Sequence, residues 1–346
     1  MEQEQQTPHK RRVRYKGKYP KKFEEKYKEL QPEKYQDTIE HVIKKGNTPA
    51  GMHISIMVQE ILDTLKIQPG ETGFDATLGY GGHTKAMLAC LNGQGHIYAT
   101  DVDPEESAKT KKRLEELGYG EDILTIRLQN FCTIDEIAKE VGGFDFILAD
   151  LGVSSMQIDN PKRGFSFKVD GPLDLRLNQE AGISAAERLD TITREELAGM
   201  LYENSDEPYC EELAKAITDE IRKGNRIDTT TKLREVIEKT LDFLPEKEKK
   251  DTIKKTCQRT FQALRIDVNR EFEVLYEFME KLPDALKPGG RVAILTFHSG
   301  EDKLVKKALK EGYRAGIYAD YSKDVVRPSA QAVSYTHLRA HETLSD

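Results

Sequence analysis

Residues 71–103 constrain the fold more than any other stretch of this chain. They read ETGFDATLGYGGHTKAMLACLNGQGHIYATDVD, in which two short apolar runs flank crowded glycines and a helix-forming run. These parts are residues 72–77, Gly79, Gly81 and Gly82, residues 84–91, residues 96–100 and a final Asp101. The order predicts a strand, a tight turn, a helix and a second strand that ends in a carboxylate. Such a unit places a ligand across the carboxyl ends of parallel strands.

The glycine turn and the acidic strand end indicate the kind of ligand. Glycine lets the backbone approach a ligand closely, and a carboxylate in the place of Asp101 can accept hydrogen bonds from ribose hydroxyls. The turn reads GYGGH rather than G-x-G-x-x-G, so it gives little support to a dinucleotide. It is more typical of an adenosine ligand without a pyrophosphate, such as S-adenosylmethionine. The alternative is an α/β domain that binds no nucleotide and merely has a tight turn here.

Composition narrows the class of protein. The chain has 346 residues, enough for two domains, with 37% hydrophobic and 33% charged residues, as in soluble globular proteins. No apolar run approaches the length of a membrane span, and the N-terminal MEQEQQTPHKRR lacks the apolar core of a secretory signal. We therefore expect a cytoplasmic protein without a membrane partner.

The cysteines and the net charge bear on metals and partners. The four cysteines are far apart and form no C-x-x-C pair, which argues against a zinc site or a disulfide framework and suits a reducing cytosol. We therefore expect no metal. The net charge of −7 by itself disfavours a nucleic-acid partner, although local clustering of charge matters more.

Residues 1–48 differ from the rest of the chain. Between Lys10 and Lys28 there are ten lysines or arginines and only two acids, with tyrosines and a phenylalanine interleaved. A basic arm of this kind can contact phosphates and stack on bases. The alternative is a solvated arm that docks on its own domain. Residues 32–45 then show an amphipathic, helical pattern.

Beyond residue 103 the strand–helix alternation continues and is then interrupted. Residues 144–151, FDFILADL, predict a strand covered on both faces, and Asp150 lies at its end. Residues 159–259 contain helical stretches and no convincing strand, including a charge run over residues 246–255 that we expect on a solvated face. A helix over residues 261–286 and a strand over residues 291–297 resume the pattern.

We therefore predict a discontinuous α/β domain over residues 49–158 and 260–330, with a helical insert over residues 159–259. Residues 332–346, AVSYTHLRAHETLSD, show no periodicity and resemble translated cloning or adaptor sequence. We exclude them from the fold.

Several longer motifs together resemble one family. From about residue 53 to residue 306 the chain is similar to the bacterial 16S rRNA (cytosine-N4)-methyltransferases of the RsmH (MraW) type. The motifs are DATLGYGGHT, DVDP, DLGVSSMQID, RGFSF, GPLDLR, RTFQALRIDVN and PGGRVAILTFHSGED. DLGVSS followed by RGFSF and FQALRI is far more specific than the glycine turn.

The resemblance implies a Rossmann-like α/β methyltransferase sheet with an inserted all-helical domain, and it makes the insert over residues 159–259 the expected RNA-recognition domain. It also implies S-adenosylmethionine as methyl donor. By position, the family's donor contacts fall on Gly81, Gly82, His83, Asp101, Phe131, Asp150 and Gln157. The implied partner is 16S rRNA or the small ribosomal subunit, with a cytosine of the decoding centre as the target. A homodimer is compatible with this resemblance.

The same chemistry suggests the catalytic and RNA-binding residues. Asp150 is the candidate to accept a hydrogen bond from the cytosine amine, Ser154 and Ser155 to orient the base, and His298 to shape its pocket. The candidate RNA contacts are Arg163, Phe165, Phe167 and Arg265. The alternatives are structural: a strand-end carboxylate for Asp150, a helix cap for the serines and packing between insert and core for the 163–167 segment.

Departures from the family pattern leave other functions open. The chain has FHSGEDK where the family has FHSLEDR, and Ser55 and Met156 where the family has proline. The family's basic C-terminal segment is missing. One competing reading is a methyltransferase for another substrate. The other is a non-catalytic RNA-binding assembly factor that retains a donor pocket.

Overall fold

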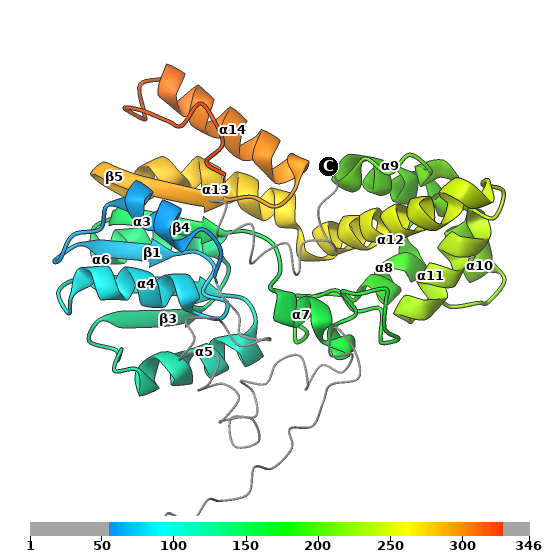
Figure 1. Ribbon diagram of the computed structural model, residues 1–346, viewed down its shortest axis with the longest axis horizontal. Coiled ribbons are helices and arrows are strands. Elements are labelled where there is room, and N and C mark those ends of the chain that lie inside the picture. The colour runs from blue at the N-terminus through cyan, green and yellow to red at the C-terminus, as the bar shows by residue number, and fades with distance from the viewer. Residues whose placement is uncertain (1–54, 328–346) are drawn as a thin grey trace, which may run out of the picture. The chain divides into compact units, whose positions relative to one another are not determined.

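The computed structural model describes residues 55–327 (Figure 1). The chain divides into two compact units, Met1–Ile54 and Ser55–Asp346, and every described residue belongs to the second. The basic arm predicted over residues 1–48 and the foreign-looking tail predicted over residues 332–346 therefore lie outside the described residues. Within the described range, no helix combines the length and the apolar character that crossing a membrane requires.

Five parallel strands form one sheet in the order β3-β2-β1-β4-β5. Their bounds are β1 Thr72–Asp75, β2 His96–Asp101, β3 Leu124–Leu128, β4 Phe144–Asp150 and β5 Leu286–Leu295. The chain moves outward from β1 to β3 and then returns to place β4 on the other side of β1. The carboxyl ends of β1 and β4 thus flank the point where the strand order reverses, which is where open α/β sheets bind ligands.

Helices cover both faces of the sheet, which explains the continuous apolar run within β4. One face packs against α3 Val58–Leu65, α4 Gly82–Leu91 and α5 Pro104–Glu116. The other packs against α6 Ile134–Val141, α13 Glu271–Ala285 and α14 Ser299–Arg314. In β4, Phe146 and Leu148 belong to the first core, whereas Ile147 and Ala149 belong to the second. The predicted α/β sheet is confirmed.

A group of helices follows β4 and precedes β5, as the sequence predicts. They are α7 Ser155–Asp159, α8 Ala185–Thr191, α9 Arg194–Ser205, α10 Cys210–Arg222, α11 Thr230–Thr240 and α12 Glu246–Asn269. Helices α8 and α9 both begin with a capping box, in which a Ser or Thr and a Glu satisfy otherwise free N–H groups. Apolar side chains between Leu173 and Leu264 form a separate hydrophobic core, and Figure 1 shows α9–α12 packed together.

Two boundaries differ from those predicted. The helix predicted over residues 261–286 is divided, because Arg270 adopts a left-handed φ of 52° between α12 and α13. Neither glycine nor proline marks this break, so the sequence pattern runs through it. The domain boundary predicted at residues 259/260 falls inside α12. Strand β5 begins at Leu286 rather than at residue 291, because Phe144 pairs with Leu286 and the Pro-Gly-Gly segment bulges out before Arg291.

Candidate active site at the carboxyl edge of the sheet

Asp101 ends β2, and two backbone groups hold its carboxylate. Oδ2 accepts a hydrogen bond from the N–H of Gly79 at 2.8 Å, and Oδ1 accepts one from the N–H of Asp103 at 2.9 Å. Burial raises the pKa of Asp101 to about 6, against the opposing effect of these two hydrogen bonds. Each oxygen keeps a further lone pair, so the carboxylate can still accept hydrogen bonds from a diol such as ribose.

Helix α5 fixes the glycine turn that precedes α4. Thr110 Oγ1 donates a hydrogen bond to the carbonyl of Gly79 at 2.6 Å. The guanidinium of Arg113 lies 3.8 Å from the centre of the Tyr80 ring, and its Nη2 donates to the Tyr80 carbonyl at 3.2 Å. The turn is therefore shaped before any ligand arrives.

Gly81 and Gly82 are required because protein atoms fill the space that a side chain would take. Gly81 has a φ of 80°, and a Cβ there would lie 2.7 Å from Cγ2 of Thr110. A Cβ on Gly82 would lie 2.1 Å from Ser55 Oγ. The sequence interpretation explained these glycines by close approach to a ligand. Packing against α5 and against the chain before α3 already demands them.

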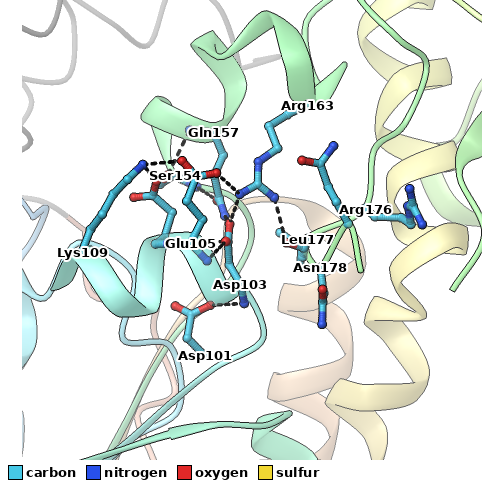
Figure 2. Close-up of polar contacts among 12 residues, drawn as sticks. Asp101, Asp103, Glu105, Lys109, Ser154, Gln157, Arg163, Arg176, Leu177 and Asn178 are labelled. Carbon is cyan, nitrogen blue, oxygen red and sulfur yellow. Dashed lines mark hydrogen bonds and ion pairs between the residues drawn. The ribbon is translucent and has the colours of Figure 1, made fainter. Parts of the chain in front are cut away.

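Asp103 is fully buried and joins three segments of the chain (Figure 2). Its Oδ1 caps α5 by accepting from the N–H groups of Glu105 and Glu106, both at 3.1 Å. Its Oδ2 accepts from Gln157 Nε2 at 3.0 Å and from Arg163 Nη2 at 2.5 Å. These partners are 54 and 60 positions away in the chain, a separation that no local pattern reports. Asp103 thus ties the loop after β2 to the segment after β4.

The two serines after Asp150 begin the short helix α7. Ser154 is its N-cap: Oγ accepts from the N–H of Gln157 at 3.2 Å, and Gln157 Oε1 accepts from the N–H of Ser154 at 2.9 Å. Ser155 is the first residue of the helix. The helix-cap alternative therefore describes the contacts of Ser154. From the sequence, Gln157 is expected among the contacts of S-adenosylmethionine. In this structure its side-chain amide binds the N–H of Ser154 and the carboxylate of Asp103.

Asp150 and His83 form a pair at the end of β4. Nδ1 of His83 lies 3.3 Å from Asp150 Oδ2, and Nε2 lies 2.8 Å from the carbonyl oxygen of Ile56. Burial would lower the pKa of His83, but the hydrogen bond and the charge of Asp150 outweigh it and raise that pKa. With an acceptor at each ring nitrogen, a protonated imidazole can donate from both. Among residues 55–327, Asp150 Oδ1 is buried without a hydrogen-bond partner.

Asp75 is a further buried carboxylate that sequence reasoning did not single out. It accepts a hydrogen bond from Thr84 Oγ1 at 2.6 Å and one from the N–H of Thr77 at 3.1 Å, and burial raises its pKa. Thr77 Oγ1 in turn accepts from the N–H of Asp150 at 2.7 Å. Asp75 thereby helps to position the end of β4. The signal in the sequence was an aspartate at the end of a strand directly before the glycine turn.

His298 lies at the start of α14, beyond the end of β5. Its Nδ1 accepts from the N–H of Glu301 at 3.5 Å, and its Nε2 lies 3.2 Å from Glu301 Oε1. Burial would raise the pKa of Glu301, but the hydrogen bond and charge of His298 hold it below its ordinary value. Glu301 Oε2 accepts from the N–H of Phe297 at 2.8 Å. His298 thus positions the loop between β5 and α14.

The four expected RNA contacts are engaged within the protein. Arg163, paired with Asp103, is 3% exposed, and Phe165 is 8% exposed. Phe167 packs edge-on against another ring of the helical core, with centroids 5.8 Å apart. Arg265 donates two hydrogen bonds of 2.8 Å to the carboxylate of Glu271. In this structure Arg163 and Phe165 are buried, whereas Phe167 and Arg265 are partly buried and held by contacts within the protein. A role of these side chains in RNA binding stays a prediction.

Phe131, expected against adenine, begins the short 3-10 helix η2 Phe131–Thr133 after β3. Its ring is partly buried and packs edge-on against Phe278 at a centroid distance of 5.2 Å. Phe131 is therefore held at the carboxyl side of the sheet by the helix layer beneath it.

One group of side chains has the composition of a metal site. Glu271, His298 and Glu301 each offer a ligand atom within 4.8 Å of the others. Arg265 already binds both oxygens of Glu271, so a cation there would face a guanidinium. The arrangement is better described as a network of charged and hydrogen-bonded side chains in which Glu301 is buried.

The reversed strand order, the fixed glycine turn and the carboxylate that ends β2 fit an S-adenosylmethionine-dependent α/β methyltransferase. The MraW methylase family matches residues 50–325, and the chain belongs to that family. It is 86% identical over 327 residues to "Ribosomal RNA small subunit methyltransferase H 1" of Agathobacter rectalis, covering 94% of each chain. It is 62% identical over 321 residues to "Ribosomal RNA small subunit methyltransferase H 2" of Alkaliphilus metalliredigens, covering 93% of this chain and 92% of that one.

Proposed function

We propose that this protein transfers the methyl group of S-adenosylmethionine to the exocyclic N4 of a cytosine in 16S rRNA. The observation that carries the proposal is the pair of carboxylates at the carboxyl edge. Asp101 keeps lone pairs for a ribose, and Asp150 Oδ1 lacks a partner among the described residues. One strand, β1, lies between the two strands that these carboxylates end, so the donor and its target base would bind on either side of it.

The residues at the edge fit the donor. Asp101 would accept the ribose hydroxyls, the glycine turn would present backbone N–H groups and Phe131 would lie near the adenine. The donor supplies an electrophilic methyl group when bound. Gln157 would act through Asp103, which fixes the loop that carries Asp101.

Asp150 would prepare the acceptor amine. The cytosine amine is conjugated with its ring, so its lone pair is a poor nucleophile. A carboxylate oxygen that accepts one of its N–H groups makes the lone pair more available and stabilises the charge that develops on nitrogen. His83 holds Oδ2 and so leaves Oδ1 for the amine. Alignment of nitrogen, carbon and sulfur supplies much of the remaining rate.

The base has to leave any stack before it reaches this edge. We therefore propose a flipped or single-stranded cytosine, and the decoding centre of the small subunit as its location. Action in the cytoplasm and a homodimer belong to the same proposal. Sedimentation of the purified protein with and without RNA tests the dimer.

The test is methylation of small-subunit rRNA, naked and in the assembled particle, with labelled S-adenosylmethionine and mass spectrometry of the product nucleosides. N4-methylcytidine at one site is the expected result. Another methylated nucleoside, or methylation only of DNA or protein, would show that the enzyme acts on a substrate other than the proposed cytosine. Donor binding without turnover on any RNA would favour a non-catalytic RNA-binding factor.

A further inference from the structure

We propose that the ring of Phe297 is the stacking platform for the target cytosine. This inference rests on the proposed function and names the group that holds the base beside Asp150. The sequence interpretation assigned stacking to Phe165 and Phe167, but both pack within the protein. Phe297 is 49% exposed and lies just beyond the carboxyl end of β5.

Phe297 lies beside the turn that follows Asp150. Leu295 pairs with Asp150 in the sheet, and its carbonyl accepts a hydrogen bond from the N–H of Leu151 at 3.1 Å. The ends of β4 and β5 therefore remain adjacent. A Cβ built on Gly152 would lie 3.6 Å from Cδ2 of Phe297, an ordinary van der Waals contact. Because Gly152 is itself exposed, the ring and this bare backbone form one accessible surface.

The segment that carries the ring is fixed from behind. The N–H of Phe297 is bound by the buried carboxylate of Glu301. A Cβ on Gly300 would lie 2.6 Å from Cζ of Phe272, so the Phe272 ring occupies the space where the family pattern places a leucine. That ring packs edge-on against His298 at 5.6 Å. A surface already in place loses little entropy when a base binds to it.

Exposure alone does not distinguish Phe297, because single exposed aromatic residues are normal on protein surfaces. Tyr202, Phe243 and Tyr276 are more exposed. Phe297 differs by its position just beyond the end of β5, the strand that pairs with β4 at Asp150, whose Oδ1 lacks a hydrogen-bond partner in the described part of the chain. An aromatic face supports the ring of a base, and such an acceptor selects an amine on its rim.

The first experiment compares Phe297→Leu with Phe297→Trp, using kcat/KM for small-subunit rRNA and the donor Kd by calorimetry. Leucine keeps apolar bulk but removes the aromatic face, so kcat/KM should fall about ten- to hundredfold, whereas tryptophan should retain activity. The donor Kd should stay within about twofold for both variants, since the ribose site lies at β2. Tyr313→Leu is the matched control, roughly 20 Å along α14 from its first turn by helix rise.

Equal losses in both Phe297 variants, or full activity in Phe297→Leu, would overturn the stacking role. Failure of the unmodified protein to methylate any rRNA would instead overturn the proposed function. The two failures are therefore distinguishable.

A second measurement does not depend on turnover. The chain contains no tryptophan, so Phe297→Trp introduces a single tryptophan at the proposed platform, which can be excited selectively at wavelengths where tyrosine does not absorb. A short single-stranded RNA with one cytosine should quench its emission saturably. The same RNA with an abasic position should not, and neither RNA should quench Tyr313→Trp. Equal quenching by the cytosine and abasic RNAs would show that no base stacks on this ring.

Discussion

The two parts of the carboxyl edge are built differently: the donor side, where we propose that S-adenosylmethionine binds at the end of β2, and the acceptor side, where we propose that the cytosine binds at the end of β4. On the donor side, Asp101 accepts two hydrogen bonds and Asp103 accepts four, all from the protein. On the acceptor side, Asp150 has one oxygen that no described residue satisfies, and Phe297 is half exposed. The carboxylates on the donor side are therefore hydrogen-bonded within the protein, whereas the acceptor side has a carboxylate oxygen without a partner among the described residues and an exposed aromatic ring.

This difference has an energetic meaning. A buried acceptor without a partner costs about 1–3 kcal/mol, so Asp150 Oδ1 would gain from a hydrogen bond that a substrate group donates. On the donor side the polar groups hydrogen-bond to one another and hold the loop rigid. A rigid loop would fix the bound donor so that its methyl group is aligned for in-line attack. On the acceptor side, Asp150 Oδ1 would accept a hydrogen bond from the amine of the cytosine. The predictions below test each side separately.

The largest expected effect is on the rigid side. Arg163→Met should lower the free energy of unfolding by about 3–5 kcal/mol, because it leaves the buried carboxylate of Asp103 without its cation. Chemical denaturation measures the loss. The double variant Asp103→Asn with Arg163→Met should recover part of it. A loss below about 1 kcal/mol would mean that the pair does not stabilise the junction between the loop after β2 and the segment after β4.

On the acceptor side, Asp150→Asn should reduce kcat about a hundred- to a thousandfold, because an amide cannot take up the developing charge as a carboxylate does. The donor Kd should change far less. Asp251→Asn, on an exposed part of α12, is the control with the same chemical change. Equal losses in kcat and in donor affinity would show that Asp150 serves donor binding as well as the acceptor amine, against the division into two sides.

Asp101→Asn should do the converse. Donor binding should weaken about tenfold to a hundredfold, as expected when hydrogen bonds to a charged group are lost. At saturating donor, kcat should be largely retained. Calorimetry with the donor, followed by turnover at high donor concentration, separates the two quantities. Unchanged donor affinity would remove the end of β2 from the ribose site.

The smallest expected effect is a pH dependence of donor binding. The pKa of Asp101 is raised to about 6, so the carboxylate is protonated below that pH and ionised above it. If ribose binds the ionised form, affinity should rise with pH and be about tenfold stronger at pH 7 than at pH 5. Asp101→Asn should flatten the profile. A profile unchanged by this substitution would point to another group, with His83 the first to examine.

Much of the fold could be predicted from local pattern. The continuous apolar run of β4 predicted burial on both faces, and its side chains alternate between the two cores. The glycine turn before α4 and the carboxylate that ends β2 could also be predicted from the sequence, because each depends on residues that are close in the chain. The break at Arg270 was not, since a left-handed residue other than glycine leaves no mark in the sequence.

The sequence predicted which residues lie at the strand ends, but it did not predict which side chains are engaged within the protein. Asp101 and Asp150 were placed at strand ends by sequence, and they lie there. Arg163, Phe165 and Gln157 looked like residues that face a ligand, because arginine, aromatic and amide side chains do so in binding sites. Whether such a side chain faces solvent or a buried carboxylate depends on contacts with segments that local pattern does not contain.

The sequence alone determined the parallel sheet, the helical insert and the strand ends that carry the acceptor oxygens, because periodicity and turn chemistry act between near neighbours. Only the tertiary structure decided that Arg163 and Gln157 bind Asp103, that Phe165 and Phe167 pack inside and that Phe297 remains exposed beside Gly152. The reason is physical: burial and ion pairing are set by which distant segments meet. A residue's chemistry states what it can bind, and its surroundings decide what it does bind.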